Sequence, residues 1–188
     1  GSLLTVDWTG DALTPFEPAL PLDGKTKIKR LDPSEVKGLH TIPVTPISYG
    51  SAKEIIGKMK GKAVPAGWQG GLPFTYRLEG GKELTVRLKV QQEKGMTRAN
   101  NVVGTLKGEL YPDEWIILGC HYDAWGFGST DPNSGTAMLL SMAETMGKMA
   151  KEGKRPARSI LIAHWDAEEH GVIGSTEWVE QFRDELGA

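Results

Sequence analysis

The chain has 188 residues, and its 22 basic and 24 acidic side chains give a formal net charge of −2. This length allows one domain, or one domain and part of a second. The charge excludes an overall basic field that would attract nucleic acid. The longest apolar runs, at 115–118 and 160–163, are far too short to span a bilayer. A single cysteine, Cys120, excludes an internal disulfide and a thiolate zinc cluster.

Residues 1–95 are rich in proline and glycine, and their apolar runs are short. Residues 51–60 form the best helix candidate in this half. A serine at the start can cap the helix, a glutamate three residues later completes a capping box, and a glycine follows the end. After a Gly-Gly turn at 80–81, alternating apolar and charged residues predict a strand with one solvated face at 84–90.

The second half of the chain has the patterns of alternating strands and helices. Apolar runs predict strands at 101–106, 115–120 and 159–165. Apolar residues at helical spacing predict helices at 134–151 and 175–186. Strands that alternate with helices indicate a parallel sheet with helices packed on it, so the fold class is α/β.

Two of these strands are followed by side chains of the types that bind metals. His121, Asp123 and Asp131 follow the second strand, and Asp166, Glu168 and Glu169 follow the third. Active sites of open α/β sheets form at the carboxyl ends of the strands, and imidazole and carboxylate are ligands that zinc accepts in hydrolases. In an acidic pair, one carboxylate can bind metal while its neighbour takes a proton from the attacking water.

Each of these features also has an ordinary structural explanation. A lone histidine after a strand is more often a hydrogen-bonded surface or core residue than a ligand. Asp131-Pro132 begins a good turn and can cap the following helix, and residues 168–170 can form a solvated loop. Taken together, however, the features require one constellation to fall by chance at two successive strand ends, so we favour a metal site.

An ordered set of motifs extends this interpretation. The motifs are GCHYDAW at 119–125, GSTDPNSG at 128–135, KEGKRP at 151–156, WDAEEHG at 165–171 and GSTEW at 174–178. In this order they resemble the M28 zinc metallopeptidases, in particular the glutamate carboxypeptidase II and transferrin receptor branch. The resemblance implies part of a zinc-exopeptidase, aminopeptidase-like sheet with helices.

Three upstream motifs resemble the late part of the protease-associated domain inserted in that branch. They are GDALTP at 10–15, IPVTPI at 42–47 and WQG at 68–70. We therefore expect residues 1–85 to be the C-terminal part of a β-rich protease-associated-like domain. Residues 86–188 are then the N-terminal part of an M28-type peptidase domain.

The resemblance also implies a role for each candidate residue. His121 binds the first zinc, Asp131 bridges both zinc ions and is followed by a cis peptide, and Glu169 binds the second zinc. Glu168 is the general base, Asp123 orients His121, and Asp166 supports the loop. A structural calcium is implied at Thr14, the Glu17 carbonyl, Glu177 and Glu180, although the dipole of a helix also favours acids in its first turn.

The complete family site takes a further Asp and a further His from beyond Ala188. We therefore expect a truncated chain that has no peptidase activity, binds zinc weakly and self-associates through a sheet edge exposed after the strand at 159–165. His164 and His170 do not fill the gap, because the segment lacks the His-Glu-x-x-His helix pattern.

The leading function is a carboxypeptidase or aminopeptidase that hydrolyses terminal peptide bonds with two zinc ions. The alternatives are a non-catalytic, transferrin-receptor-like binding module and a zinc acyltransferase of the glutaminyl cyclase type. The first ten residues lack a secretory signal pattern, and the resemblance alone implies an extracellular, periplasmic or membrane-anchored ectodomain. It also implies a peptide substrate and a homodimeric complete protein.

Overall fold

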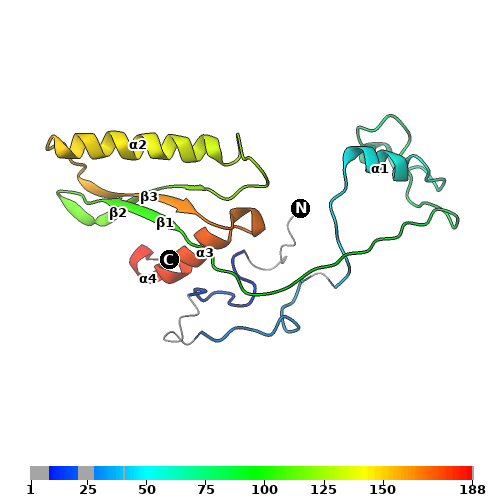
Figure 1. Cartoon of the computed structure of the whole chain (residues 1–188), viewed down its shortest axis with the longest axis horizontal. Helices are drawn as coiled ribbons and strands as arrows, with labels where there is room; N and C mark the ends of the chain where they lie inside the picture. Colours follow the sequence, from blue (N-terminus) through cyan, green and yellow to red (C-terminus); the bar gives the residue numbers. More distant parts are fainter. Residues whose placement is uncertain (1–8, 21–27, 40, 188) are drawn as a thin grey trace. The chain divides into compact units, whose positions relative to one another are not determined.

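The computed structural model of the chain describes residues 9–20, 28–39 and 41–187 (Figure 1). The described residues divide into two compact units. One unit holds residues 41–94, and the other joins the N-terminal segments to residues 95–187. In the second unit, the segment around residues 10–19 is hydrogen-bonded to a helix of the second half of the chain.

The first unit contains helix α1 (Tyr49–Ile56) and the short 3-10 helix η1 (Ala66–Trp68). The predicted helix at 51–60 is therefore shifted toward the N-terminus. Ser48 caps it by accepting a hydrogen bond from the backbone N–H of Ser51 at 3.1 Å, and Gly57 ends it. The cap lies three residues earlier than predicted because the serine at 48 takes the role assigned to the serine at 51.

The predicted strand at 84–90 is wrong. Residues 84–90 form no strand in the structure, and the side chains of Val86, Leu88 and Val90 are exposed. Within residues 41–94 as described, β pairing is limited to the isolated bridge between Ala63 and Arg77. An alternating pattern marks a segment that suits a half-buried sheet surface, but a strand also requires a partner strand to receive its hydrogen bonds.

The second unit is built on a three-stranded sheet of β1 (Val102–Leu106), β2 (Tyr111–His121) and β3 (Arg158–Trp165), in the order β1-β3-β2. All three predicted strands are confirmed. β2 pairs with β3 in parallel, as predicted, whereas β1 pairs with β3 in the antiparallel direction. A helical crossover joins β2 to β3 and permits parallel pairing, and no such crossover constrains β1.

β3 is the central strand of the described sheet, with β1 on one side and β2 on the other. The exposed edge that we expected to follow the strand at 159–165 is therefore not beside β3. In the described part of the sheet, β1 and β2 occupy the outer positions. Val102 of β1 and Ile116 of β2 are exposed there.

Helix α2 (Asn133–Lys151) covers one face of the sheet, and α3 (Ile173–Gln181) and α4 (Arg183–Leu186) lie on the other (Figure 1). The predicted helix at 134–151 is confirmed. The helix predicted at 175–186 is interrupted at Phe182, whose backbone angles of φ −109° and ψ 25° are not helical. None of the helices in the described ranges is long and apolar enough to cross a membrane.

An aromatic cluster packs α3 and α4 onto the sheet. Its ring centroids lie 4.8–6.3 Å apart, and its members are Trp115, Trp165, Trp178 and Phe182. Leu161 and Ala163 of β3 and Leu139 of α2 are also buried. Because β3 and α3 are both fixed by this packing, the turn that joins them is held at the carboxyl end of the sheet.

Candidate metal centre

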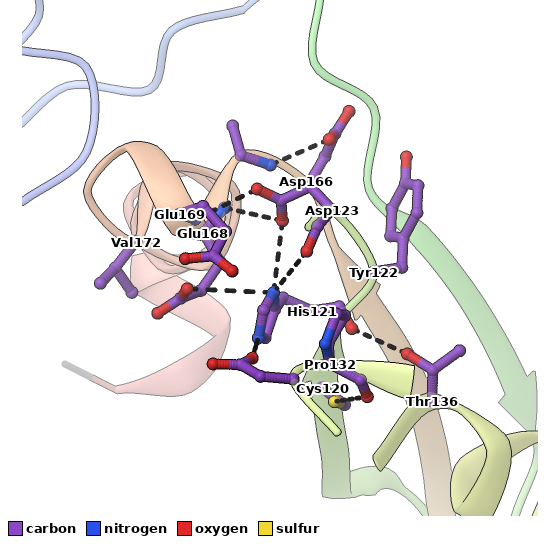
Figure 2. Close-up of polar contacts among 12 residues, drawn as sticks. Cys120, His121, Tyr122, Asp123, Pro132, Thr136, Asp166, Glu168, Glu169 and Val172 are labelled. Atoms are coloured by element: carbon purple, nitrogen blue, oxygen red, sulfur yellow. Dashed lines mark hydrogen bonds and ion pairs between the residues drawn. The ribbon is translucent and has the colours of Figure 1, made fainter. Parts of the chain in front are cut away.

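His121 is the last residue of β2, and its ring contacts the loops on both sides. Nε2 lies 2.7 Å from Oδ1 of Asp131, and Nδ1 lies 3.0 Å from the backbone carbonyl oxygen of Asp123 (Figure 2). The Thr136 hydroxyl of α2 donates to the His121 carbonyl at 2.8 Å. The backbone and the ring of His121 are therefore both held by neighbouring groups.

Opposing effects set the protonation of His121. Burial lowers the pKa of its imidazole, but the hydrogen bond to Asp131 and the negative charge of Glu168 outweigh burial and leave the pKa above its ordinary value. The carboxylates around the ring thus favour positive charge at this position.

Glu168 and Glu169 lie in the 3-10 helix η2 (Glu168–His170), in the turn after β3. The carboxylate of Asp123 accepts hydrogen bonds from the backbone N–H groups of Glu168 at 3.0 Å and Glu169 at 3.1 Å (Figure 2). Asp123 Oδ1 also lies 3.5 Å from Nδ1 of His121. Asp123 therefore joins the two strand ends and contacts the histidine that it was expected to orient.

Three of the candidate side chains form a compact group. One ligand atom from each of His121, Glu168 and Glu169 lies within 4.8 Å of the others. An imidazole nitrogen and two carboxylates are a donor set that suits zinc, and the raised pKa of His121 shows that the group attracts positive charge. The residues present therefore fit a metal ion.

Asp131 stands beside this group and is not a member of it. Its side chain is 74% exposed and bonds directly to Nε2 of His121, so a metal bound at Nε2 must replace that hydrogen bond. The peptide bond between Asp131 and Pro132 is cis, as predicted.

Asp166 lies at the start of the turn and is hydrogen-bonded within it. Its carboxylate accepts hydrogen bonds from the backbone N–H groups of Asn100 at 2.8 Å and Ala167 at 2.9 Å. Asn101 is a further contact that the sequence analysis missed. Its side chain bonds to the backbone of Asp166 and Gly174. No local pattern could reveal this role, because it depends on the antiparallel pairing of β1 with β3.

The same turn has an unusual backbone. Ala167 and Val172, which flank the residues 168–171, have positive φ angles of 55° and 56°. This left-handed region is sterically unfavourable for residues with a Cβ, and most of all for a β-branched valine. The packing and hydrogen bonds around the turn must therefore offset the strain.

A cavity of about 260 Å³ opens next to Glu169. Trp125 and His170 line it, with their rings edge to face at a centroid distance of 5.0 Å. The other lining residues are Thr97, Arg98, Ala99, Asp123, Ala124, Asp166, Ala167 and Glu169. The group of His121, Glu168 and Glu169, called the metal group below, therefore borders a space large enough for part of a peptide.

The residues predicted to bind calcium lie around α3. The carboxylate of Glu177 accepts hydrogen bonds from the backbone N–H groups of Asp11 and Ala19, both at 2.5 Å. Thr14, in the loop between them, is 2% exposed, and its hydroxyl has no hydrogen-bond partner among the described residues. Glu180 is buried on α3 and shares a hydrogen bond with Glu177, while Glu17 is exposed and donates its backbone N–H to the Thr14 carbonyl.

Burial raises the pKa of Glu177 above its ordinary value, although the two backbone N–H groups partly oppose this rise. The carboxyl groups of half-buried Glu177 and buried Glu180 share a hydrogen bond, so they need a proton or a cation between them. The hydroxyl of Thr14, without a hydrogen-bond partner among the described residues, lies in the segment between Asp11 and Ala19, whose backbone N–H groups bind Glu177. The group therefore fits an oxygen-binding cation such as calcium.

Residues 101–187 match the sequence profile of peptidase family M28. The chain is 44% identical over 195 residues to a glutamate carboxypeptidase 2 homolog of Caenorhabditis briggsae, an alignment that covers 99% of this chain and 24% of that protein. It is 39% identical over 189 residues to aminopeptidase NAALADL1 of Rattus norvegicus, which covers 96% of this chain and 25% of that protein.

The chain is also 38% identical over 175 residues to transferrin receptor protein 2 of Homo sapiens, which covers 93% of this chain and 21% of that protein. The chain thus spans about a quarter of the length of the relatives that it matches. Residues 101–187 of this chain therefore match peptidase family M28, and the chain is similar to the branch that includes the glutamate carboxypeptidase 2 homologs, aminopeptidase NAALADL1 and transferrin receptor protein 2.

Proposed function

We propose that the protein to which this chain belongs is a zinc-dependent exopeptidase that hydrolyses terminal peptide bonds with two metal ions. The observation that carries this proposal is the group of His121, Glu168 and Glu169, whose ligand atoms lie within 4.8 Å of one another in a segment that matches peptidase family M28. The names of two relatives, a carboxypeptidase and an aminopeptidase, support a terminal peptide bond as the substrate.

Each residue has a distinct role in this proposal. His121 and Glu169 would each hold a zinc ion, and Asp131 would be a ligand of both. Bound zinc supplies a Lewis acid and a water of lowered pKa. Glu168 takes the proton from the attacking water and passes it to the departing amine. Asp123 keeps Glu168 and Glu169 facing His121 by binding their backbone N–H groups.

A non-catalytic binding module is the second candidate, because transferrin receptor protein 2 is 38% identical to this chain. The two candidates differ in what they require of the acidic pair. A peptidase needs Glu168 as a proton carrier, whereas a binding module does not. The presence of both glutamates beside His121 favours the peptidase.

The proposal extends to a calcium ion held by Thr14, Glu177, Glu180 and the carbonyl of Glu17. The buried Thr14 hydroxyl and the hydrogen bond between Glu177 and buried Glu180 support it. Calcium takes six to eight oxygen ligands, which these groups supply together with water. The ion would fasten the N-terminal segment to α3.

We also propose that residues 1–85 are part of a protease-associated-like insert. The complete protein is extracellular, periplasmic or membrane-anchored in this proposal, and it is a homodimer. These proposals rest on the family resemblance. For the isolated chain we propose weak zinc binding, no turnover and self-association. Analytical ultracentrifugation of the chain and of the complete protein measures both assembly states.

The test uses the complete protein with peptides blocked at either the amino or the carboxyl end. We expect turnover of one blocked series, two zinc ions per chain by elemental analysis, and a loss of at least 100-fold in kcat for Glu168→Gln. Glu114→Gln is the matched control, because Glu114 pairs with Arg158 at 2.6 Å at the other end of the sheet. A protein that binds no zinc, or a Glu168→Gln variant with unchanged kcat, would contradict the proposal.

A further inference from the structure

The turn that carries Glu168 and Glu169 is anchored at both of its ends by one side chain. Asn101 lies just before β1, and its Oδ1 accepts a hydrogen bond from the backbone N–H of Asp166 at 3.1 Å. Its Nδ2 donates to the carbonyl oxygen of Gly174 at 2.8 Å. Asp166 opens the turn and Gly174 lies in the first turn of α3, so the amide closes the segment that contains both acids.

The space around this amide is shaped for it. A Cβ added at Gly174 would meet Oδ1 of Asn101 at 2.3 Å and the carbonyl oxygen of Asp166 at 2.4 Å. The backbone N–H of Gly174 also donates to the Asp166 carbonyl at 3.0 Å. Gly174 therefore permits a close approach that a larger residue would prevent.

A side-chain amide meets both demands at this position. The backbone N–H of Asp166 requires an acceptor, and the Gly174 carbonyl requires a donor. An aspartate could accept but not donate, and it would place a negative charge against the Gly174 carbonyl. The chemistry of asparagine is thus matched to the two ends of the turn.

The turn needs this external support because its backbone is strained. Ala167 and Val172 both adopt left-handed angles, at φ 55° and 56°. Asp123 holds the acids from the side of β2, and Asn101 holds the ends from the side of β1. The two side-chain hydrogen bonds of Asn101 run to the backbone of Asp166 and Gly174.

We propose that Asn101 is a positioning residue of the metal group, which fixes the carboxylates of Glu168 and Glu169 against His121 by closing the turn at Asp166 and Gly174. This inference rests on the proposed function, since it assumes that the group binds metal. Loss of the amide removes no ligand. It lets the turn relax, and metal affinity falls because the donor atoms are no longer preset.

The test titrates Co²⁺ and Zn²⁺ into the chain and into variants, below the melting temperature of each. Co²⁺ is used because its visible spectrum reports the geometry of its ligands. We expect Asn101→Ala to weaken binding 10- to 100-fold, as for other groups that orient metal ligands, and to shift the Co²⁺ spectrum. Asn101→Asp keeps the acceptor alone and should also weaken binding, which preserves the test if Asn101→Ala does not fold.

Ser159→Ala is the matched control. Ser159 is buried at the start of β3, and its hydroxyl accepts from the Gly108 N–H at 3.0 Å and donates to the Pro112 carbonyl at 2.6 Å. It therefore loses the same kinds of hydrogen bond at the other end of the strand. We expect a lower melting temperature with unchanged affinity and spectrum.

Three results are distinguishable. A folded Asn101 variant with the affinity and spectrum of the original chain overturns the positioning role, and so does an equal loss of affinity in Ser159→Ala. If the original chain itself binds neither Co²⁺ nor Zn²⁺ at millimolar concentration, the proposed metal site fails, and the inference about Asn101 fails with it.

Discussion

Nε2 of His121 lies 2.7 Å from Oδ1 of Asp131, so the end of β2 is bonded directly to the loop that precedes α2. This bond is one cause of the raised pKa of His121, after the opposing effect of burial. A raised histidine pKa means that folding favours the protonated ring. The stabilisation is complete below the ordinary pKa of about 6.5 and is lost as the pH rises through the raised value.

For the metal-free chain, we therefore expect His121 to contribute less to the free energy of unfolding at pH 8 than at pH 6. Zinc must displace the proton, so zinc affinity should change in the opposite direction and increase over the same range. Urea unfolding with EDTA and zinc titration at both pH values measure the two effects. His121→Asn should flatten both profiles, and a zinc affinity that is equal at pH 6 and pH 8 would contradict the assignment of His121 as a ligand.

Replacing Trp178 with alanine should destabilise the second unit. Trp178 is buried and packs on Trp115, Trp165 and Phe182, so its removal should cost about 3–5 kcal/mol. Phe127→Ala is the control, because Phe127 is 98% exposed and its loss should change stability by less than about 0.5 kcal/mol. Chemical denaturation followed by circular dichroism measures both, and equal effects would show that the aromatic cluster is misassigned.

Replacing Phe16 with glycine should stabilise the chain. Phe16 has a φ of 67° and a side chain that is 58% exposed, so glycine removes left-handed strain at a residue outside the buried core. The relief of about 1–2 kcal/mol exceeds the entropic cost of about 0.5–1 kcal/mol for glycine. We expect a net gain of about 0.5–1 kcal/mol in thermal unfolding, whereas Phe127→Gly at an exposed position should give no gain.

Calcium should stabilise the chain through Glu177 and Glu180. At a free concentration 100 times Kd, a ligand that binds the folded state adds about 2.7 kcal/mol. Without calcium, the raised pKa of Glu177 means that its contribution to stability falls as the pH rises above the ordinary value of 4.5 toward the raised value. Bound calcium should remove that fall.

Differential scanning calorimetry at pH 4.5 and pH 7, with calcium or with EGTA, tests this prediction. Glu180→Gln should abolish the calcium response, and so should Thr14→Val if the Thr14 hydroxyl is a ligand. Magnesium at the same concentration serves as the ionic-strength control. An unchanged melting temperature with calcium would remove this site from the proposal.

The strand ends were the most predictable part of the site. Apolar runs placed β2 and β3 in sequence, and parallel strands end at the same edge of a sheet, so His121 and Glu169 could be expected to meet. A contact between Asp123 and His121 was also expected. Its two hydrogen bonds to the backbone of Glu168 and Glu169 could not be predicted from the sequence. The hydrogen-bond partners of a carboxylate depend on the fold and not on the residues next to it in sequence.

The errors have a common physical origin in contacts between distant segments. Residues 84–90 have the period of a strand but no strand partner in the described chain. The direction of β1 depends on which edge of β3 it joins. The helix predicted through Phe182 is apolar on the expected side, yet its backbone breaks there, where the ring packs on Trp178 at 4.8 Å.

Because β3 is hydrogen-bonded to a strand on each side, its position also affects how the site unfolds locally. Backbone amides in the centre of a sheet exchange with solvent last, because they are released only by the largest opening motions. The turn from Asp166 begins where this slowly exchanging strand ends, and it continues into a helix held by side-chain contacts. Local unfolding that exposes Glu168 and Glu169 therefore begins at α3 or with the loss of the Asn101 hydrogen bonds, and not in β3. Metal occupancy should consequently change deuterium uptake in residues 166–174 while residues 160–164 keep the same uptake.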